Sequence, residues 1–241
     1  MDFANFLDQV RLQAGALRTA AVAAGPDADV PTCPDWDVRR LVRHVARVHS
    51  FVVRALDADP AGPAPERGQP PEGWDETLSW WDEQLDAMVT GIAARGPAGP
   101  AWAFGRDRTA GFWARRQAHE TAVHRLDAEH ALAGPAVPAL VFEPDFAADG
   151  VDEALQMITL RLRREPAEVA GTVLLHAADA GRAWLVTLTP GAAPRVGPAD
   201  VIDADASVVG TADAVYRAAW RRPSTAVVSG DRALVDALRT P

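Results

Sequence analysis

The sequence predicts an α+β protein in which an antiparallel four-helix bundle precedes a smaller α/β domain. Residues 1–143 hold four stretches with apolar residues at helical spacing, separated by breaks rich in Gly and Pro. Residues 144–241 instead alternate helical patterns with short β-rich runs. A length of 241 residues, 48% of them hydrophobic, is sufficient to bury the cores of both domains.

Two amphipathic helices begin the predicted bundle. In residues 3–24 apolar side chains recur at helical spacing until Gly25 and Pro26 end the pattern. A Pro-bounded loop then leads to Asp37, a good N-cap, and to a second helix over residues 38–56. Val and Leu side chains line one face of this second helix, which predicts that this face is buried in the bundle.

Two further helices complete the predicted bundle. Residues 58–73 are too rich in Pro and Gly for a regular element and indicate an exposed connection. The third helix covers residues 74–94, and the fourth covers about residues 112–132 and ends at Gly134 and Pro135. Four helices of similar length joined by loops favour an antiparallel bundle.

The second domain is expected to mix helices and strands. Its predicted elements are, in order, a helix over 146–164, strands over 171–178, 183–189 and 204–210, a helix over 211–222, a strand or turn over 225–231 and a closing helix over 232–240.

The composition excludes several classes of protein. The chain has 24 basic and 33 acidic residues and a net charge of −9, so its bulk charge does not favour binding to nucleic acid or to an anionic membrane. All the basic residues are arginines, which we attribute to a GC-rich coding bias. The absence of lysine excludes Schiff-base chemistry and a P-loop. A single cysteine, Cys33, permits neither an internal disulfide nor a cysteine metal cluster.

We expect a soluble, cytoplasmic protein. Acidic residues stand near the start of the sequence, where a signal peptide carries positive charge, and no run of about 18 apolar residues occurs. The expected partners are therefore small molecules, with no nucleic acid and no membrane among them. The sequence does not distinguish a monomer from a homodimer.

The densest group of metal-ligand side chains lies on the fourth predicted helix, in the stretch AHETAVHRLDAEH. His119 and His124 are five residues apart, which places them about 140° apart around a helix, so they cannot bind one metal together. Glu120 and His124 are four residues apart and project from one face. His44, on the inward side of the second helix, supplies a third ligand. These three residues predict a divalent-metal site with an open coordination position.

A purely structural interpretation of these residues also remains open. His44 and His124 would then be hydrogen-bonded core or rim histidines, and Glu120 would be a solvated acid on the helix surface. His49, five residues after His44, points elsewhere, and we expect a surface or capping role for it. Asp127 falls on the same stripe as Glu120 and His124, where it either hydrogen-bonds a ligand histidine or forms a salt bridge with an arginine.

Two stretches resemble the mycothiol-dependent maleylpyruvate isomerase family of actinobacteria. VPTCPDWDVRRLVRHVARVHSF is similar to the family's Pro-x-Trp and Leu-x-x-His signature, and RRQAHETAVHRLDAE is similar to its second metal motif, Arg-x-x-x-His-Glu-x-x-x-His-x-x-Asp. The resemblance covers nearly the whole chain. It implies a DinB-like four-helix metal-binding domain over residues 1–143, a sterol-carrier-like α/β domain over residues 144–241, and metal ligands at His44, Glu120 and His124.

Fewer residues carry the resemblance in the C-terminal domain. The family has a Trp-Gly-Arg segment followed by Gly-Asp before a last helix, and here Trp220, Arg221, Arg222 and the stretch VVSGDRALVDAL stand in those places. Arg222 takes the arginine position, whereas Arg221 departs from the usual glycine. Arg222 is therefore a candidate catalytic residue that holds a substrate carboxylate, and a surface charge at a helix end is the alternative.

The resemblance implies an enzyme whose nucleophile is a small external molecule and not one of its own side chains. A metal-bound low-molecular-weight thiol, mycothiol, serves as cosubstrate in this interpretation, because metal coordination lowers the pKa of a thiol. The thiolate would either isomerise a maleylpyruvate-like substrate about its cis double bond or form a stable conjugate with another small electrophile, which makes the protein an isomerase or a thiol S-transferase. Zinc is the expected metal, and nickel, cobalt or iron also suit these ligands. The alternative is a non-catalytic ligand- or partner-binding module with a vestigial metal site.

Overall fold

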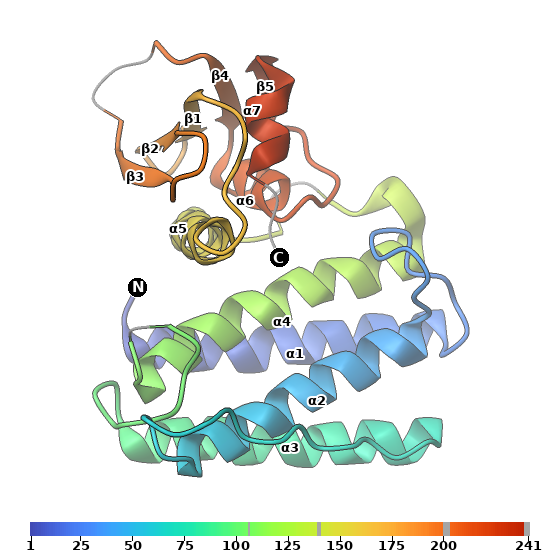
Figure 1. The fold of residues 1–241 in the computed structure, drawn as a ribbon. Coiled ribbons are helices and arrows are strands. Elements are labelled where there is room, and N and C mark those ends of the chain that lie inside the picture. The colour runs from blue at the N-terminus through green and yellow to red at the C-terminus, as the bar shows by residue number, and fades with distance from the viewer. Residues whose placement is uncertain (106, 139–140, 200–202, 239–241) are drawn as a thin grey trace. The chain divides into compact units, whose positions relative to one another are not determined.

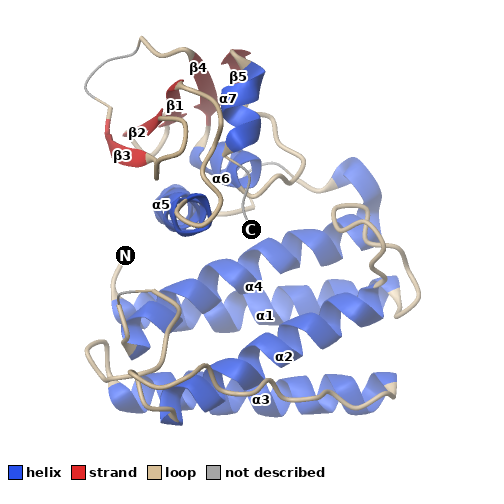
Figure 2. Cartoon of the chain, viewed as in Figure 1, coloured by secondary structure: helices blue, strands red, loops and turns tan. Residues whose placement is uncertain are grey.

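Four long helices build the first of two units in the computed structural model, and a mixed β-sheet with helices builds the second (Figures 1 and 2). The first unit comprises Met1–Val137 and the second Pro138–Pro241. The structure describes residues 1–105, 107–138, 141–199 and 203–238. This α+β architecture confirms the predicted fold class. The predicted domain boundary, between residues 143 and 144, lies a few residues after the division between the two units.

The first unit is a bundle with the predicted number of long helices. These are α1 (Phe3–Ala24), α2 (Val38–Asp57), α3 (Trp74–Arg95) and α4 (Ala110–Ala133), and the 3₁₀ helix η1 (Gly134–Ala136) follows α4. α1 packs mainly against α4 and α2 against α3, while α2 also contacts α4 (Figure 1). Asp37 caps α2, because its side chain accepts a hydrogen bond from the Arg40 backbone N–H at 2.7 Å, as predicted. In the described part of the chain, no helix is both long enough and apolar enough to span a bilayer.

Apolar side chains from all four helices form the core of the first unit. The completely buried apolar side chains include Val10, Leu17, Leu41, Val45, Met88, Ile92 and Leu126. Within each helix these residues are spaced by about one or two turns, so each helix buries a single stripe. The Pro-rich connection over residues 58–73 contains no helix or strand, as predicted, and Arg43 of α2 donates a hydrogen bond to the Pro71 carbonyl within it.

His49 belongs to this core, so the prediction of a surface or capping role for it is wrong. Its side chain is completely buried. Trp81 Nε1 of α3 donates to His49 Nδ1 at 3.0 Å, and Thr121 Oγ1 of α4 lies 3.3 Å from His49 Nε2. Because Nδ1 accepts, the neutral ring carries its proton on Nε2 and donates it to Thr121. The indole N–H of Trp81 needs an acceptor inside the core, and His49 provides it.

The second unit combines a five-stranded sheet with three helices. Its elements are α5 (Pro144–Leu162), β1 (Gly171–Ala177), β2 (Arg182–Leu188), β3 (Arg195–Pro198), β4 (Ala206–Gly210), α6 (Ala212–Ala219), β5 (Val227–Gly230) and α7 (Arg232–Ala237). The strand order is β3-β2-β1-β4-β5, and β1 and β4 pair in parallel while all other neighbours are antiparallel. The edge strand β3 was not predicted, because its four residues are mostly exposed and show no run of apolar side chains.

α5 and α6 pack closely through aromatic rings. Tyr216 of α6 is completely buried, and its ring lies 5.5 Å from Phe142 and 6.3 Å from Phe146. Gly150 of α5 faces the same ring, and a Cβ atom at this position would lie 2.4 Å from Tyr216 Cε2. Only glycine therefore permits this approach of the two helices.

We predict that His49 makes the protein less stable in acid. Burial, together with the neighbouring His124 and His44, outweighs the effect of Glu120 and lowers the pKa of His49 from 6.5 to about 3. Because the unfolded chain binds a proton at this ring more readily than the folded chain, the free energy of unfolding falls as the pH drops from 6.5 toward 3. The slope from this one group is at most about 1.4 kcal/mol per pH unit.

The variant His49→Gln tests this prediction. Glutamine can still accept from Trp81 and donate to Thr121, but it does not titrate. Denaturant unfolding at several pH values between 6.5 and 4 should therefore show a shallower loss of stability for His49→Gln than for the wild-type chain. Equal slopes for the two proteins would contradict the prediction.

Candidate metal centre

His44, Glu120 and His124 come together in the first unit. His44 projects from α2, and the other two residues project from α4. His44 Nε2 lies 3.3 Å from Glu120 Oε1, and His124 Nε2 lies 3.4 Å from the same oxygen. One ligand atom from each of the three residues lies within 4.8 Å of the other two. Two imidazole nitrogens and one carboxylate oxygen form a donor set that suits zinc and related divalent metals.

Arg116 orients the carboxylate of Glu120. It lies one helical turn before Glu120 on α4 and pairs with Oε2, so Oε1 faces the two histidines. Burial by itself raises the pKa of Glu120, but the charge of Arg116 and the hydrogen bonds from His124 and His44 outweigh burial and hold this pKa well below its ordinary value. The Glu120 side chain is only 13% exposed, so the interpretation of this residue as a solvated surface acid is wrong.

Asp127 fixes the ring of His124 from the side opposite Glu120. Its carboxylate Oδ2 lies 2.9 Å from His124 Nδ1, which is the hydrogen-bonded alternative considered from the sequence. Asp127 is completely buried and also accepts hydrogen bonds from Thr32 Oγ1 at 2.5 Å and Cys33 Sγ at 3.4 Å. Because Nδ1 donates to Asp127, Nε2 of His124 is directed toward the other two members of the candidate ligand trio, which consists of His44, Glu120 and His124. Burial lowers the pKa of His124, but Asp127 and Glu120 outweigh it and raise this pKa to about 9.

The loop before α2 carries the residues that support the trio. Backbone hydrogen bonds from Val30 N–H to the Trp36 carbonyl at 2.9 Å and from Cys33 N–H to the Val30 carbonyl at 3.0 Å hold it together. The Trp36 ring lies 5.0 Å from the His44 ring and stacks on the His124 ring at 6.2 Å. Trp36 therefore forms one wall of the candidate centre.

The other histidines of the first unit do not join the trio. His119 is buried on another face of α4, where its ring meets the edge of Phe6 at 6.1 Å, as expected from its angular separation from His124. His130 Nδ1 lies 2.8 Å from the Gly134 carbonyl at the end of α4. Neither side chain contributes a ligand atom to the group formed by His44, Glu120 and His124.

Arg222 lies in the second unit, just after α6. Its backbone N–H donates to the Arg217 carbonyl at 2.8 Å, and its Nη1 donates to the Trp220 carbonyl at 2.7 Å. The preceding Arg221 has a φ of 58°, a left-handed conformation that glycine adopts more readily, and this explains the glycine in the resembled pattern. The role of Arg222 in holding a substrate carboxylate stays a prediction.

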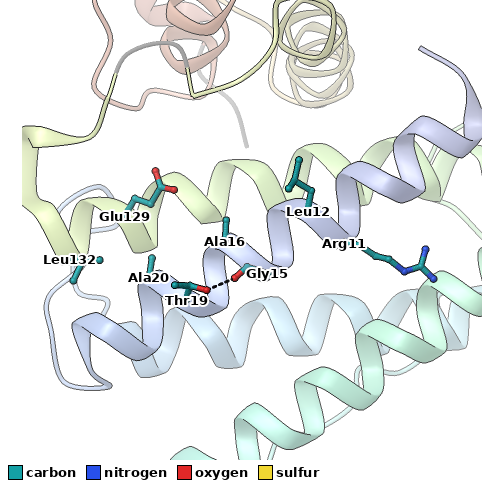
Figure 3. A pocket seen from close by; sticks show the side chains of 8 residues that line it. All are labelled: Arg11, Leu12, Gly15, Ala16, Thr19, Ala20, Glu129 and Leu132. Carbon is teal, nitrogen blue, oxygen red and sulfur yellow. Dashed lines mark hydrogen bonds between the residues drawn. The ribbon is translucent and has the colours of Figure 1, made fainter.

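A groove of about 570 Å³ lies on the surface formed by α1 and α4, and Figure 3 shows the side chains that line it. The lining residues are Arg11, Leu12, Gly15, Ala16, Thr19, Ala20, Glu129 and Leu132. This set contains none of the three candidate ligands, and its side chains are mostly small or apolar. We therefore assign the chemistry to the trio and not to this groove.

Two supporting residues of the trio were missed from the sequence. Thr32 lies 95 residues from Asp127 along the chain, so no local pattern predicts their hydrogen bond. Arg116 was not predicted as the partner of Glu120, although its spacing of four residues from Glu120 is the usual signal of an ion pair on a helix.

Comparisons with known proteins agree with the fold. Residues 7–129 match the mycothiol maleylpyruvate isomerase N-terminal domain, and residues 145–237 match the MDMPI C-terminal domain. A crystal structure of the mycothiol-dependent maleylpyruvate isomerase superposes with a TM-score of 0.63 at 14% sequence identity and covers 95% of this chain and 93% of that chain. A His-to-Ala mutant of that enzyme gives a TM-score of 0.62 with the same identity and coverage.

No curated protein matches the chain. The two domain matches are consecutive along the chain and together span most of it. The chain therefore belongs to the mycothiol maleylpyruvate isomerase family.

Proposed function

We propose that the chain holds a divalent metal at His44, Glu120 and His124 and uses it to activate mycothiol toward a small electrophile. The observation that carries this proposal is the convergence of His44 Nε2 and His124 Nε2 on one oxygen of Glu120, at 3.3 and 3.4 Å. Membership in a family that includes a mycothiol-dependent isomerase supports the choice of thiol.

The residues of the trio fit a metal such as zinc or nickel. Two of the three ligands form a further hydrogen bond through the atom that faces away from the site. His124 Nδ1 is bonded to Asp127, and Glu120 Oε2 is bonded to Arg116. Such supporting hydrogen bonds are typical of metal ligands. When bound, the metal lowers the pKa of a coordinated thiol, so that thiolate is available at neutral pH.

The protein's own side chains position the reactants. Trp36 covers the rings of His44 and His124 on one side. The chain has no lysine, and its single cysteine, Cys33, donates a hydrogen bond to Asp127. The nucleophile is therefore supplied by the external thiol in this proposal.

Two reactions are compatible with an activated thiol. With a maleylpyruvate-like substrate, the thiolate adds to the cis double bond, the resulting single bond rotates, and elimination of the thiolate returns the trans isomer. With another electrophile, the new carbon–sulfur bond persists and the protein is a thiol S-transferase. Arg222 remains our candidate for holding a substrate carboxylate in either reaction.

The first prediction concerns metal content. Wild-type protein reconstituted with excess zinc and then desalted should retain about one metal ion per chain. His44→Ala and His124→Ala should lose most of it, because each removes one of three ligands, whereas His176→Ala in the second unit should retain it. Elemental analysis of the purified proteins measures the content. Wild-type protein that binds no divalent metal under these conditions would refute the metal proposal.

A second prediction concerns protons. The pKa of His124 is raised to about 9, so its ring is mostly protonated at pH 7 and must lose a proton before Nε2 can bind a metal. Metal binding should therefore release about one proton from His124 at pH 7, and the affinity should rise with pH until about pH 9.

Calorimetric titration with zinc in buffers of different ionisation enthalpy measures the number of protons released. Asp127→Asn removes the carboxylate that favours the protonated ring, so this variant should release fewer protons at pH 7. The same number of protons from both proteins would contradict this origin of the raised pKa.

A third prediction concerns the reaction itself. Metal-loaded protein should convert electrophiles only when mycothiol is present, and His44→Ala should abolish this thiol-dependent activity. Proton NMR of the products distinguishes a trans isomer from a thioether conjugate and so separates an isomerase from an S-transferase. Loss of activity toward carboxylates in Arg222→Met would support the role of Arg222. Metal-bound protein without any thiol-dependent turnover would instead favour a non-catalytic binding module with a vestigial site.

A further inference from the structure

We propose that Arg47 binds the carboxylate of an anionic electrophile beside the metal centre. This inference rests on the proposed function, because the bound electrophile is the one that the activated thiol attacks. It adds a residue of α2 to the groups that hold a substrate carboxylate, besides the candidate Arg222 of the second unit.

The packing of α2 against α4 determines the position of Arg47 along the helices. His44 Nε2 lies 3.3 Å from Glu120 Oε1, and the rings of Phe51 and Trp113 lie 6.0 Å apart. Residue numbers therefore rise along α2 as they fall along α4, so the two helices are antiparallel. Residue 47 lies about midway between residues 44 and 51. Along the axis of α2, Arg47 therefore stands between the trio and the two aromatic rings.

Helical geometry places Arg47 on the accessible side of the trio. At about 100° per residue, Arg47 lies about 60° around α2 from His44. This rotation carries it away from His49, which is completely buried on the other side of α2. The side chain of His44, in contrast, is 34% exposed. Arg47 therefore lies on the side of His44 that is turned away from the buried face of α2.

The guanidinium of Arg47 is not engaged within the described part of the chain. Arg116 is paired with Glu120, and Arg43 donates to carbonyls of the Pro-rich connection. Arg40 donates to a carbonyl of the loop before α2 and lies over an indole ring of that loop. For Arg47, the Nε atom is buried and has no hydrogen-bond partner among the described residues. A buried N–H of a charged group is costly to leave unpaired, so a ligand that supplies an acceptor gains binding energy there.

Gln117 of α4 contributes a second unpartnered polar group at the same level. It is 1% exposed, and its Oε1 has no hydrogen-bond partner among the described residues. Gln117 is seven residues before His124 and therefore lies on the same face of α4. When the terminal amide of Gln117 rotates by half a turn, its NH₂ group takes the place of Oε1 and can donate to a ligand. Arg47 and Gln117 together then offer donors to one carboxylate.

The chemistry of arginine favours a carboxylate over other ligands at this position. The guanidinium is always charged and can donate two parallel N–H groups to the two oxygens of a carboxylate. With chloroacetate as a simple substrate, the thiolate of mycothiol attacks the CH₂ carbon, a carbon–sulfur bond forms, and the carbon–chlorine bond breaks to release chloride. The carboxylate is unchanged and remains on the thioether product.

A matched pair of electrophiles tests the inference by activity. Chloroacetate and chloroacetamide undergo the same displacement and have similar size, but only chloroacetate is anionic. For Arg47→Met we expect kcat/KM with chloroacetate to fall at least about tenfold and kcat/KM with chloroacetamide to change less than about twofold. Arg54→Met, an exposed arginine on the same helix, is the control and should change neither value by more than about twofold. An equal loss for both electrophiles, or no loss for either, overturns the proposal.

A binding measurement tests Arg47 without metal, thiol or turnover. In ¹⁵N-labelled, metal-free protein the Nε–H signal of Arg47 is identified by its absence in Arg47→Met. Addition of propionate should shift this signal and propionamide should not, because only propionate carries the charge. If the thiol-dependent activity fails but propionate shifts the signal, the proposed function is wrong and the carboxylate site stands. No shift at saturating propionate overturns the carboxylate site.

Discussion

The contact between α2 and α4 is the constraint on which the candidate metal centre depends. His44 is 76 residues from Glu120 along the chain, and only the packing of the two helices brings their side chains within 3.3 Å. The same contact places the ring of Phe51 against that of Trp113. Because apolar packing sets the register of the helices, a shift by one turn would separate the histidine from the carboxylate and disperse the donor atoms.

Burial of a carboxylate between two helices is unfavourable unless other groups compensate for the lost hydration. Glu120 meets this requirement with Arg116 on one oxygen and two histidines on the other. Asp127, which is more deeply buried, is satisfied by His124 and by Thr32 and Cys33 of the loop before α2. The two carboxylates thus hold the His124 ring between them, with Nδ1 toward Asp127 and Nε2 toward Glu120.

Local charge around the trio differs from the charge of the whole chain. The protein carries a net charge of −9, yet Arg40, Arg43 and Arg47 of α2 and Arg116 of α4 stand within about one helical turn of a candidate ligand. Most of these guanidinium groups pair with a carboxylate or with backbone carbonyls. These arginines stabilise the fold around the trio through those pairs. Arg47 differs because its buried Nε has no partner in the described residues, and this difference is the basis for assigning it to a ligand.

The sequence by itself determined the helices of the first unit, the cap at Asp37 and the shared face of Glu120 and His124, because periodicity and spacing report how side chains are directed around their own helix. It offered His44 as a third ligand, but only the packing of α2 against α4 brings His44 to Glu120. Periodicity does not report which neighbouring helix meets a given face. For this reason only the tertiary structure decided that His49 is a core acceptor for Trp81, that Thr32 bonds Asp127, and that Glu120 is buried. The edge strand β3 likewise has no apolar pattern of its own and forms by pairing with β2. These features depend on contacts between residues that are distant in the chain, and such contacts form only when the helices and strands pack.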